Sequence, residues 1–453
     1  MKKIGLYLFT NDLRIKDNLL LHHAAQSVDE LICIIVGPNL SQFSADFAQE
    51  LEYGSRRRDF VSQSIANLAA NLESLGQKLL LLSQNRLEPY TTIQTFSHVI
   101  ASQNVTHFFS SVHCGYDERS LTNKLLDKHP NLISSLSHHS TLFEQDELPF
   151  ELSKLPRSFS KFRMQVEHMD IDTPETVVSD LPPAPASLQD ESEVLTESPL
   201  SSVYLGGETA GLAHLKRYFS QSYARSYKQT RNAFDGIENS TKFSPWLALG
   251  CVSPKTIYRH LKEFEAHHGA NDSTYWIYFE LLWREYFYWN GLSLGSSLFG
   301  TNNEPENQYT STTSNLCFTK WKSGNTNYPI VDACMRQLNA TGYMSNRGRQ
   351  LVASCLIYEL GIDWRHGAAY FESQLIDYDV ASNWGNWAYI ARALNSQSNS
   401  HANKQASANQ PQPKSRHFDL VKQTEMYDPE HTFINKWHRE DEASASPRYQ
   451  DVI

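Results

Sequence analysis

The sequence has no apolar run long enough to cross a membrane. The chain begins with two lysines, Lys2 and Lys3, followed by a few apolar residues, but Thr10, Asn11 and Asp12 interrupt this run, and no small-residue cleavage site follows. The segment therefore predicts a first β-strand rather than a signal peptide. With neither a signal nor a membrane span, we expect a cytoplasmic protein without membrane contact.

The chain also lacks the residue spacings that hold metals or form disulfide frameworks. Its six cysteines show no CxxC spacing, and its 18 histidines show no HExxH pattern. We expect buried thiols in a reducing compartment and no metal site. No glycine-rich loop follows a predicted strand, so the dinucleotide-binding fingerprint is absent as well.

Basic charge is scarce overall, since 40 Lys and Arg stand against 50 Asp and Glu, a net charge of −10. A surface that is basic throughout is excluded, so any nucleic-acid site has to be a local patch. The Lys and Arg residues between 216 and 284 allow one, although such charges more often form a solvated face.

The length of 453 residues predicts two or three domains. In the first 135 residues, short apolar runs alternate with amphipathic segments. We expect strands at 4–9, 31–36, 78–82 and 107–112, and helices at 56–75 and 93–102. This alternation predicts an α/β N-terminal domain, residues 1–135, with a parallel, doubly wound sheet.

The rest of the chain is a connector followed by a helical region. Residues 136–205 are an expected interdomain connector, because 170–199 is acidic and rich in proline and serine. The pattern at 206–437 is helical, with a low-complexity insert at 394–414 that has too little apolar area to become ordered. Residues 438–453 form a short polar tail.

Two helical stretches carry the candidate chemistry. Residues 275–292 are aromatic on nearly every face, which predicts a central buried helix whose Glu280, Arg284 and Glu285 need partners. Such a stripe is usually only core, but its charges favour a ligand. Residues 341–392 concentrate Trp, Arg, Asn and Asp. There Asp377 and Asp379 follow an apolar face and require a cation or donor, for which Arg347 and Arg349 are the nearest candidates. Spacing alone favours a structural ion pair as much as a ligand site.

Several motifs in these stretches resemble those of a known protein family. The Asn-Arg-Gly-Arg turn at 346–349, Asp-Trp-Arg at 363–365, and Asp-Tyr-Asp at 377–379 ahead of Asn383 resemble the flavin-binding core of the DNA photolyase/cryptochrome family. LPRSFSKFRMQVE, GGETAGLAHLKRYF, YKQTRNAFDG, STKFSPWLALGCVSP and RHFDLVKQTEMYDPE resemble its DASH branch, and NDLRIKDN extends the likeness to the N-terminal half. The resemblance implies an all-α C-terminal domain that binds FAD in a bent shape.

The resemblance also implies which residues contact FAD. They are Tyr227, Ser240, Thr241, Lys242, Phe243, Ser244, Glu280, Arg284, Asn346, Arg349, Asp377, Asp379 and Asn383. The run 240–244 would bind the pyrophosphate, with hydroxyls, backbone N–H groups and one lysine; a capped helix entry is the alternative. Arg349 paired with Asp377 would lie near the ring, Asp379 would accept from ring and ribose donors, and Asn383 would face flavin N5.

The implied activity is light-driven repair of cyclobutane pyrimidine dimers by electron transfer from reduced FAD. Glu280, Asn346, Arg347, Gln350, Asn383 and Tyr389 match catalytic positions. Gln350 and Tyr389 stand where conventional photolyases tend to carry Met and Trp. The resulting pocket is more polar and offers less stacking area, which favours lesions in single-stranded DNA, where base flipping costs least.

Two accessory features follow from the same resemblance. Trp387 and Trp364 match the inner two members of the photoreduction chain, whereas the outer position falls near Ser311 and is not Trp; Tyr309 or Trp321 would substitute, or the chain is shortened. DASH proteins often bind 5,10-methenyltetrahydrofolate as an antenna, with a Glu after the fourth strand, but Glu118 does not align cleanly with it.

Three functions remain open at this stage. The first is a single-strand-preferring photolyase, expected to be a monomer. The second is a blue-light receptor that signals through partners; signalling relatives generally carry long C-terminal extensions, and this chain ends sixteen residues after Trp437, which favours the first. The third is a helical scaffold without flavin, which would make the motif matches coincidental.

Overall fold

The computed structural model describes residues 2–37, 40–41, 44, 47, 50, 52–82, 89–173, 178–188, 203–300, 312–393 and 417–438. The low-complexity insert, the tail beyond 438, Tyr309, Ser311 and part of the acidic connector lie outside these residues. The chain divides into two compact units: unit 1 is Met1–Asn39, Arg58–Gln229 and Thr241–Gly295, and unit 2 is Leu40–Arg57, Thr230–Ser240 and Ser296–Ile453. Within the described ranges, no helix is long and apolar enough to cross a membrane.

Unit 1 contains a parallel sheet of five strands in the order β3-β2-β1-β4-β5. The strands are β1 (Ile4–Phe9), β2 (Glu30–Val36), β3 (Leu79–Leu82), β4 (His107–Ser111) and β5 (Ile133–Ser137). The apolar strands β1 and β2 are buried on both faces, as is typical of a parallel sheet. The sequence did not predict β5, because this edge strand reads Ile-Ser-Ser-Leu-Ser and leaves Ile133 60% exposed.

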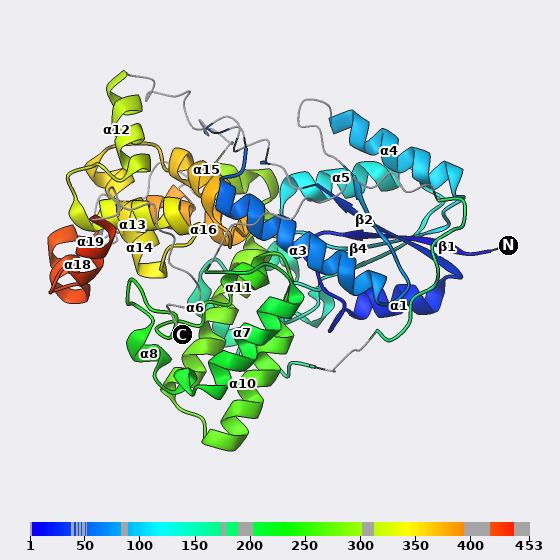
Figure 1. Ribbon diagram of the computed structural model, residues 1–453, viewed down its shortest axis with the longest axis horizontal. Helices are drawn as coiled ribbons and strands as arrows, with labels where there is room; N and C mark the ends of the chain where they lie inside the picture. The colour runs from blue at the N-terminus through cyan, green and yellow to red at the C-terminus, as the bar shows by residue number, and fades with distance from the viewer. Residues whose placement is uncertain are drawn as a thin grey trace. The chain divides into compact units, whose positions relative to one another are not determined.

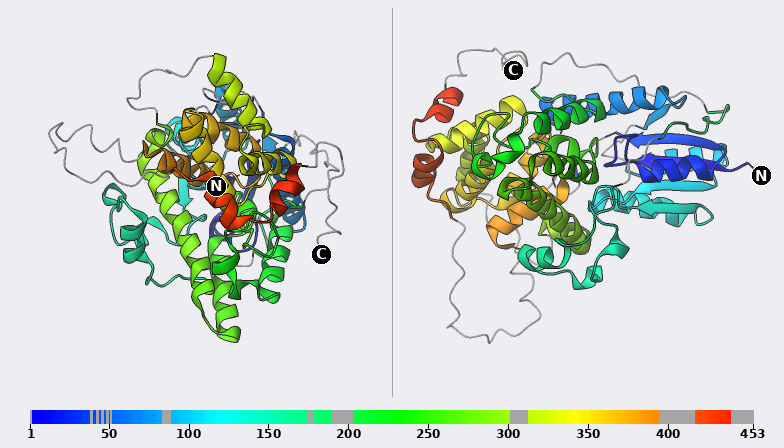
Figure 2. Two further views of the ribbon diagram at one scale, coloured as in Figure 1. Left: turned by 90° about the vertical axis from the view of Figure 1, so that its left-hand side faces the viewer. Right: turned by 90° about the horizontal axis from the view of Figure 1, so that it is seen from below.

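Helices cover both faces of this sheet. Helices α4 (Pro89–Ser102) and α5 (Tyr116–Lys128) bury Phe96 and Leu125 against Leu6 and Ile34 on one face. Helix α1 (Leu19–Ser27) lies on the opposite face, in front of the strands in the view from below (Figures 1 and 2). The remaining described helix between the strands of this sheet is α3 (Ser55–Glu73), which connects β2 to β3. The predicted α/β fold with a doubly wound sheet is confirmed.

The Asn11–Asn18 segment joins the sheet to the helical part of unit 1. Arg14 is 2% exposed, and its guanidinium donates to the carbonyl oxygens of Asp17, His139 and Gly250. A Cβ at Gly250, whose φ is +66°, would collide with the carbonyl oxygen of Asn11. The buried carboxylate of Glu208 accepts hydrogen bonds from the backbone N–H groups of Ile15 and Lys16. Through these contacts, the NDLRIKDN motif at 11–18 packs against the helical part of unit 1.

The helical part of unit 1 begins within the predicted connector. It contains η1 (Gln145–Glu147), η2 (Leu152–Lys154), α6 (Phe159–Val166), α7 (Glu208–Ser220), η3 (Tyr223–Arg225), α8 (Tyr227–Thr230, whose last residue belongs to unit 2), α9 (Ser244–Ala248), α10 (Pro254–His268) and α11 (Asp272–Leu294). Helix α11 is the predicted aromatic helix. It is not buried on every side, since Tyr275 is 40% exposed.

Unit 2 is helical. It contains most of η4 (Gly295–Phe299), then α12 (Thr312–Ser323), α13 (Pro329–Thr341), α14 (Asn346–Ser354), the π-helical turn η5 (Cys355–Glu359), α15 (Trp364–Gln374), α16 (Val380–Ala391), α18 (Leu420–Tyr427) and α19 (Thr432–His438) (Figure 1). Residues 350–359 are therefore divided between the end of α14 and a π turn. All six cysteines are free thiols, and the expectation that each is buried is wrong only for Cys317, which is half-buried.

Candidate functional site

The most buried charge pair among the predicted site residues joins Arg349 to Asp377. One guanidinium nitrogen, Nη2, lies 2.9 and 2.8 Å from the two carboxylate oxygens, and Nε donates to the carbonyl oxygen of Met344 at 2.9 Å. The side chain of Asp377 is 2% exposed, whereas that of Arg349 is 27% exposed. The ion pair expected from spacing is confirmed, and its arginine retains an accessible side.

Arg347, the other candidate cation, has different partners. Its two terminal nitrogens donate to the amide oxygens of Asn232 at 3.2 Å and Gln423 at 3.4 Å. The guanidinium lies over the rings of Tyr427, at 4.7 Å, and Phe418, at 5.9 Å. Burial lowers the pKa of Arg347 from its ordinary value. The hypothesis that Arg347 neutralises one of the paired carboxylates is not supported by these contacts.

Helix α14 starts with the predicted Asn-Arg-Gly-Arg turn. The hydroxyl of Ser345 caps the helix by accepting from the N–H of Gly348 at 3.1 Å. Asn346 is exposed at the first helical position, and Gln350 is half-buried four residues later. Residues four apart share a helix face, so Asn346 and Gln350 project from the same side of α14.

The start of α16 holds two more predicted residues. Asp379 is the N-cap, and its carboxylate accepts from the N–H of Ser382 at 2.7 Å. Asn383 is 8% exposed, and its amide nitrogen donates to the carbonyl oxygen of Ala368 at 3.0 Å. This bond orients the amide of Asn383. Tyr389, near the end of the same helix, is 37% exposed.

The two predicted electron-transfer tryptophans each contact another tryptophan. Trp387 is 2% exposed, and its ring centroid lies 6.2 Å from that of Trp321. Trp364 begins α15 and meets Trp384 edge-on, with 5.8 Å between the centroids. Gly367 lies against Trp387, where a Cβ would collide with the indole. The contact of Trp364 with Trp384 was not predicted.

A buried carboxylate in unit 2, Glu372, was missed. It is 2% exposed, and it accepts hydrogen bonds from the N–H of Ser41 at 2.7 Å, the hydroxyl of Tyr378 at 2.8 Å and the indole N–H of Trp384 at 3.2 Å. Several donors are what a buried carboxylate needs. A lone acid inside the apolar run at 368–376 is the sequence signal that could have found it.

In unit 1, the predicted phosphate-side run leads into α9. Lys242 is 5% exposed and has a left-handed φ of 52°. The ring of His214 donates from Nε2 to the carbonyl oxygen of Thr241 at 2.8 Å, and burial lowers the pKa of His214, so the imidazole is neutral at pH 7. Phe243 occupies the N-cap position and makes no side-chain capping bond. A capped helix entry therefore does not account for this run.

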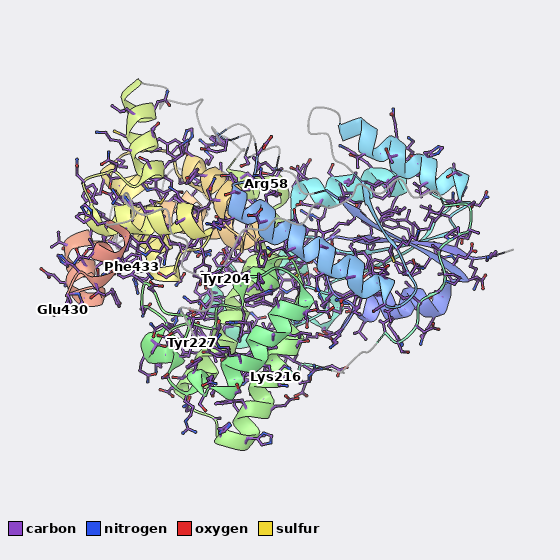
Figure 3. The ribbon with its side chains drawn as sticks, in the orientation of Figure 1. Arg58, Tyr204, Lys216, Tyr227, Glu430 and Phe433 are labelled. Carbon is purple, nitrogen blue, oxygen red and sulfur yellow. The ribbon has the colours of Figure 1, made fainter. Side chains whose placement is uncertain are left out.

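The other predicted flavin contacts are divided between the two units. Tyr227 is buried at the start of α8 and belongs to unit 1 (Figure 3), as do Thr241, Lys242, Phe243 and Ser244. Ser240 belongs to unit 2.

Helix α11 carries Glu280 and Arg284 one turn apart, both half-buried. Arg284 donates to the carbonyl oxygens of Ser140 and, at 3.4 Å, Leu247. Trp283, which was not among the predicted site residues, lies three residues after Glu280 and therefore shares its face. One face of this half-buried indole stacks on Phe159, with 3.8 Å between centroids.

The next acid of α11, Glu285, is fully buried. Its carboxylate accepts from the backbone N–H groups of Leu142, at 2.8 Å, and Phe143, at 3.4 Å, and from the indole N–H of Trp289 at 2.8 Å. Burial raises the pKa of Glu285 to about 7, although these donors and Arg284 oppose the shift. The residue thus holds the 140–143 loop against α11.

Comparison with known proteins decides the family. Residues 276–448 match the FAD binding domain of DNA photolyase, and residues 5–185 match the DNA photolyase family model. A cryptochrome DASH of Vibrio parahaemolyticus is 49% identical to the chain over 455 residues, covering 100% of this chain and 96% of the relative. The chain belongs to the cryptochrome DASH branch of the DNA photolyase/cryptochrome family.

Solved structures share the fold of this chain. The crystal structure of a Synechocystis cryptochrome matches with a TM-score of 0.82 and 36% identity, covering 96% of this chain and 89% of that one. A class III photolyase of Agrobacterium tumefaciens, 24% identical, shares the fold with a TM-score of 0.76 over 100% and 92% of the two chains. The predicted family, the DASH branch and the presence of an FAD-binding domain are confirmed.

Proposed function

We propose that this cryptochrome DASH is a blue-light-dependent DNA photolyase that repairs cyclobutane pyrimidine dimers, preferentially in single-stranded DNA. The observation that carries the proposal is the Arg349–Asp377 pair, which lies within the segment that matches the FAD binding domain of DNA photolyase. Burying a charged pair costs desolvation energy that the attraction between the two charges offsets only in part. Such a pair is therefore expected to have a specific structural or ligand-binding role. The partly accessible arginine beside a buried carboxylate suits a polar aromatic ring that carries both donors and acceptors.

The donor set fits FAD. On the phosphate side, hydroxyls of Tyr227, Ser240, Thr241 and Ser244 and the ammonium of Lys242 are groups that bind a pyrophosphate. The left-handed backbone at Lys242 turns the chain there, and the ring of His214 donates to the Thr241 carbonyl oxygen, an acceptor that would otherwise repel an anion. On the ring side we assign Glu280, Arg284, Asn346, Arg349, Asp377, Asp379 and Asn383.

Bound FAD supplies light absorption and a single electron that splits the dimer and then returns. The chain's own residues orient the cofactor and control charge around it. Asn383 presents a neutral amide whose orientation is set by its bond to Ala368, so it can face a ring of varying charge and protonation. Asp377 holds the guanidinium of Arg349 in place through two contacts. No nucleophile is required.

The lesion pocket would be formed by Glu280, Asn346, Arg347, Gln350, Asn383 and Tyr389, with Trp283 added from its position beside Glu280. The carboxylate of Glu280 would accept hydrogen bonds from the two linked bases of the pyrimidine dimer. Gln350 and Tyr389 provide a polar rim with little stacking area. Extrusion of a dimer from a duplex costs a few kcal/mol, which such a rim does not offset, so a single strand is the better substrate.

Photoreduction of the flavin would use Trp387 and Trp364. Their ring contacts with Trp321 and Trp384 supply candidates for the next member of the chain within the described residues. A 5,10-methenyltetrahydrofolate antenna is proposed from membership of the DASH branch alone; Glu118 contacts His113 at 3.5 Å.

The test is a repair assay. Purified protein is illuminated with blue light in the presence of single-stranded or duplex oligonucleotides that contain one thymine dimer, and intact thymines are counted. We expect a yellow protein that repairs the single strand faster. A yellow protein that repairs neither oligonucleotide would favour the alternative function, a blue-light receptor. A folded but colourless protein would exclude both the photolyase and the receptor.

A further inference from the structure

Helix α11 presents large aromatic side chains on a face that is not fully covered. Trp276, Phe279 and Trp283 are half-buried, and Tyr275 is 40% exposed. Residues at 276, 279, 280 and 283 follow a helical spacing, so this aromatic stripe (Tyr275, Trp276, Phe279 and Trp283) runs along the helix past Glu280.

The rings of the stripe contact one another and a common support. Trp276 and Phe279 have centroids 4.5 Å apart, and Tyr275 lies 6.2 Å from Phe279. Phe159 of α6 packs edge-on against Phe279 at 5.1 Å and stacks on Trp283 at 3.8 Å. Helix α6 contacts α11 directly (Figure 1). The stripe is therefore a supported ladder of rings, rather than scattered surface aromatics.

Two cations lie over the ladder. The guanidinium of Arg163 is 5.4 Å from the centroid of Phe279, and the ammonium of Lys228 is 5.9 Å from that of Trp276. Each also contacts a carboxylate: Arg163 pairs with Glu167 at 3.3 Å, and Lys228 pairs with Asp272 at 2.9 Å. The Lys228–Asp272 pair is exposed, so it contributes little and is readily exchanged for a phosphate, whereas the Arg163–Glu167 pair is more covered and supplies a fixed cation beside the rings.

We propose that the aromatic stripe binds the unpaired nucleotides next to the lesion, with bases stacked on Trp276 and Phe279 and phosphates at Lys228 and Arg163. This rests on the proposed function, because Glu280 on the same face belongs to the lesion pocket. Interleaved rings and cations are the pattern by which proteins hold single strands. The rings stack on base faces, which a duplex keeps covered, so the occupant is a single strand.

The length of the aromatic stripe suits a short stretch of single strand. We call the row of nucleotide positions along it the track. Seven residues separate Trp276 from Trp283, which is about 10 Å along a helix at 1.5 Å per residue. A strand that advances about 3.4 Å per nucleotide covers this length with about three nucleotides. The track therefore adds a few flanking nucleotides to the dimer itself.

The direct test measures binding of undamaged oligothymidylate of 12 nucleotides by fluorescence anisotropy in the dark. Trp276→Leu should weaken binding about tenfold or more, because stacking on one ring is worth roughly that factor. Lys228→Gln should weaken it less and reduce the salt slope by about 0.7. Tyr116→Ala, at a 38% exposed tyrosine of α5, is the matched control and should bind as wild type. Unchanged binding by Trp276→Leu, with its flavin absorbance and melting temperature intact, would overturn the track.

A second measurement separates this inference from the repair activity. The wild type should prefer a dimer within a 12-mer over an isolated dinucleotide dimer, and the ratio of kcat/KM values should shrink about tenfold in Trp276→Leu. An unaltered ratio contradicts the track even where repair is efficient. If no dimer is repaired by any variant while the dark binding loss persists, the track stands and the photolyase assignment fails.

Discussion

The indole N–H of Trp384 donates to the carboxylate of Glu372 at 3.2 Å, and both side chains are buried. The same carboxylate oxygen accepts the hydroxyl of Tyr378 at 2.8 Å. Tyr378 lies between Asp377 and Asp379, and Trp384 follows Asn383. Glu372 thus anchors the loop and first turn that carry three of the proposed flavin contacts, although we assign it no contact with flavin.

Glu372→Gln should destabilise unit 2 by about 2–4 kcal/mol, because an amide has one acceptor oxygen for donors that now approach both carboxylate oxygens. The measurement is thermal and chemical unfolding. Glu425→Gln, at an exposed position of α18, is the control and should stay within about 0.5 kcal/mol of wild type. Equal melting temperatures for the two variants would contradict the anchoring role.

Arg349→Ala should yield protein with little bound flavin, since it leaves Asp377 buried without its cation, at a cost of about 3–5 kcal/mol. Arg349→Lys should not restore binding, because an ammonium cannot reach both Asp377 and the Met344 carbonyl oxygen with the same geometry. The ratio of visible to ultraviolet absorbance reports flavin content. As a control, Arg259→Lys on α10, where Arg259 contacts Glu263 at 4.0 Å, should keep the yellow colour. Wild-type flavin content in Arg349→Ala would place the cofactor elsewhere.

Glu280→Ala should reduce repair about 10- to 100-fold while flavin is retained, because a hydrogen bond from the lesion to a charged acceptor is lost. Single-turnover repair under constant light measures this step. Glu263→Ala, on the neighbouring helix α10, serves as the control. Undiminished repair in Glu280→Ala would show that the lesion pocket is misplaced.

Trp387→Phe should slow photoreduction without affecting repair by chemically reduced protein, since phenylalanine is much harder to oxidise than tryptophan. Transient absorption follows the tryptophan radical. The same measurement on Trp321→Phe and Trp384→Phe tests which ring continues the chain, because each contacts one member of the proposed pair. Normal photoreduction in Trp387→Phe would exclude this route.

The contribution of Glu285 to stability should fall as pH rises from about 4.5 to 7, whereas the buried imidazoles of His139 and His214, whose pKa values burial lowers, act in the opposite direction below pH 6.5. Burial raises its pKa to about 7 in the folded state, so the folded protein keeps a proton that the unfolded chain releases. The contribution is at most about 3 kcal/mol, given the size of the shift. Burial raises the pKa of Asp12 and Glu208 as well, in the same direction. Glu285→Gln should therefore make the slope of unfolding free energy against pH more positive between pH 4.5 and 7; an unchanged slope would mean that Glu285 is ionised in the fold.

Much of the fold was predictable because local signals were strong. The apolar runs at β1, β2 and β4 mark buried parallel strands, and the proline at the start of α10 marks its first turn. Strand β5 escaped detection because an exposed edge strand needs few apolar residues. The π turn at 355–359 was also unpredictable, since the apolar spacing of a helix is nearly unchanged by it.

By itself, the sequence indicated the family and the α/β and helical halves, because its motifs are dense. Residue spacing left Arg347 and Arg349 both open as the cation for the paired acids, and only the family resemblance favoured Arg349 with Asp377. Only the tertiary structure decided that Arg347 bonds to Asn232 and Gln423, that Glu372 holds Trp384, and that Phe159 supports the rings of α11. These partners lie from 12 to 124 residues apart in the chain. Hydrogen-bond direction and ring stacking depend on how helices pack, and residue spacing carries no record of that.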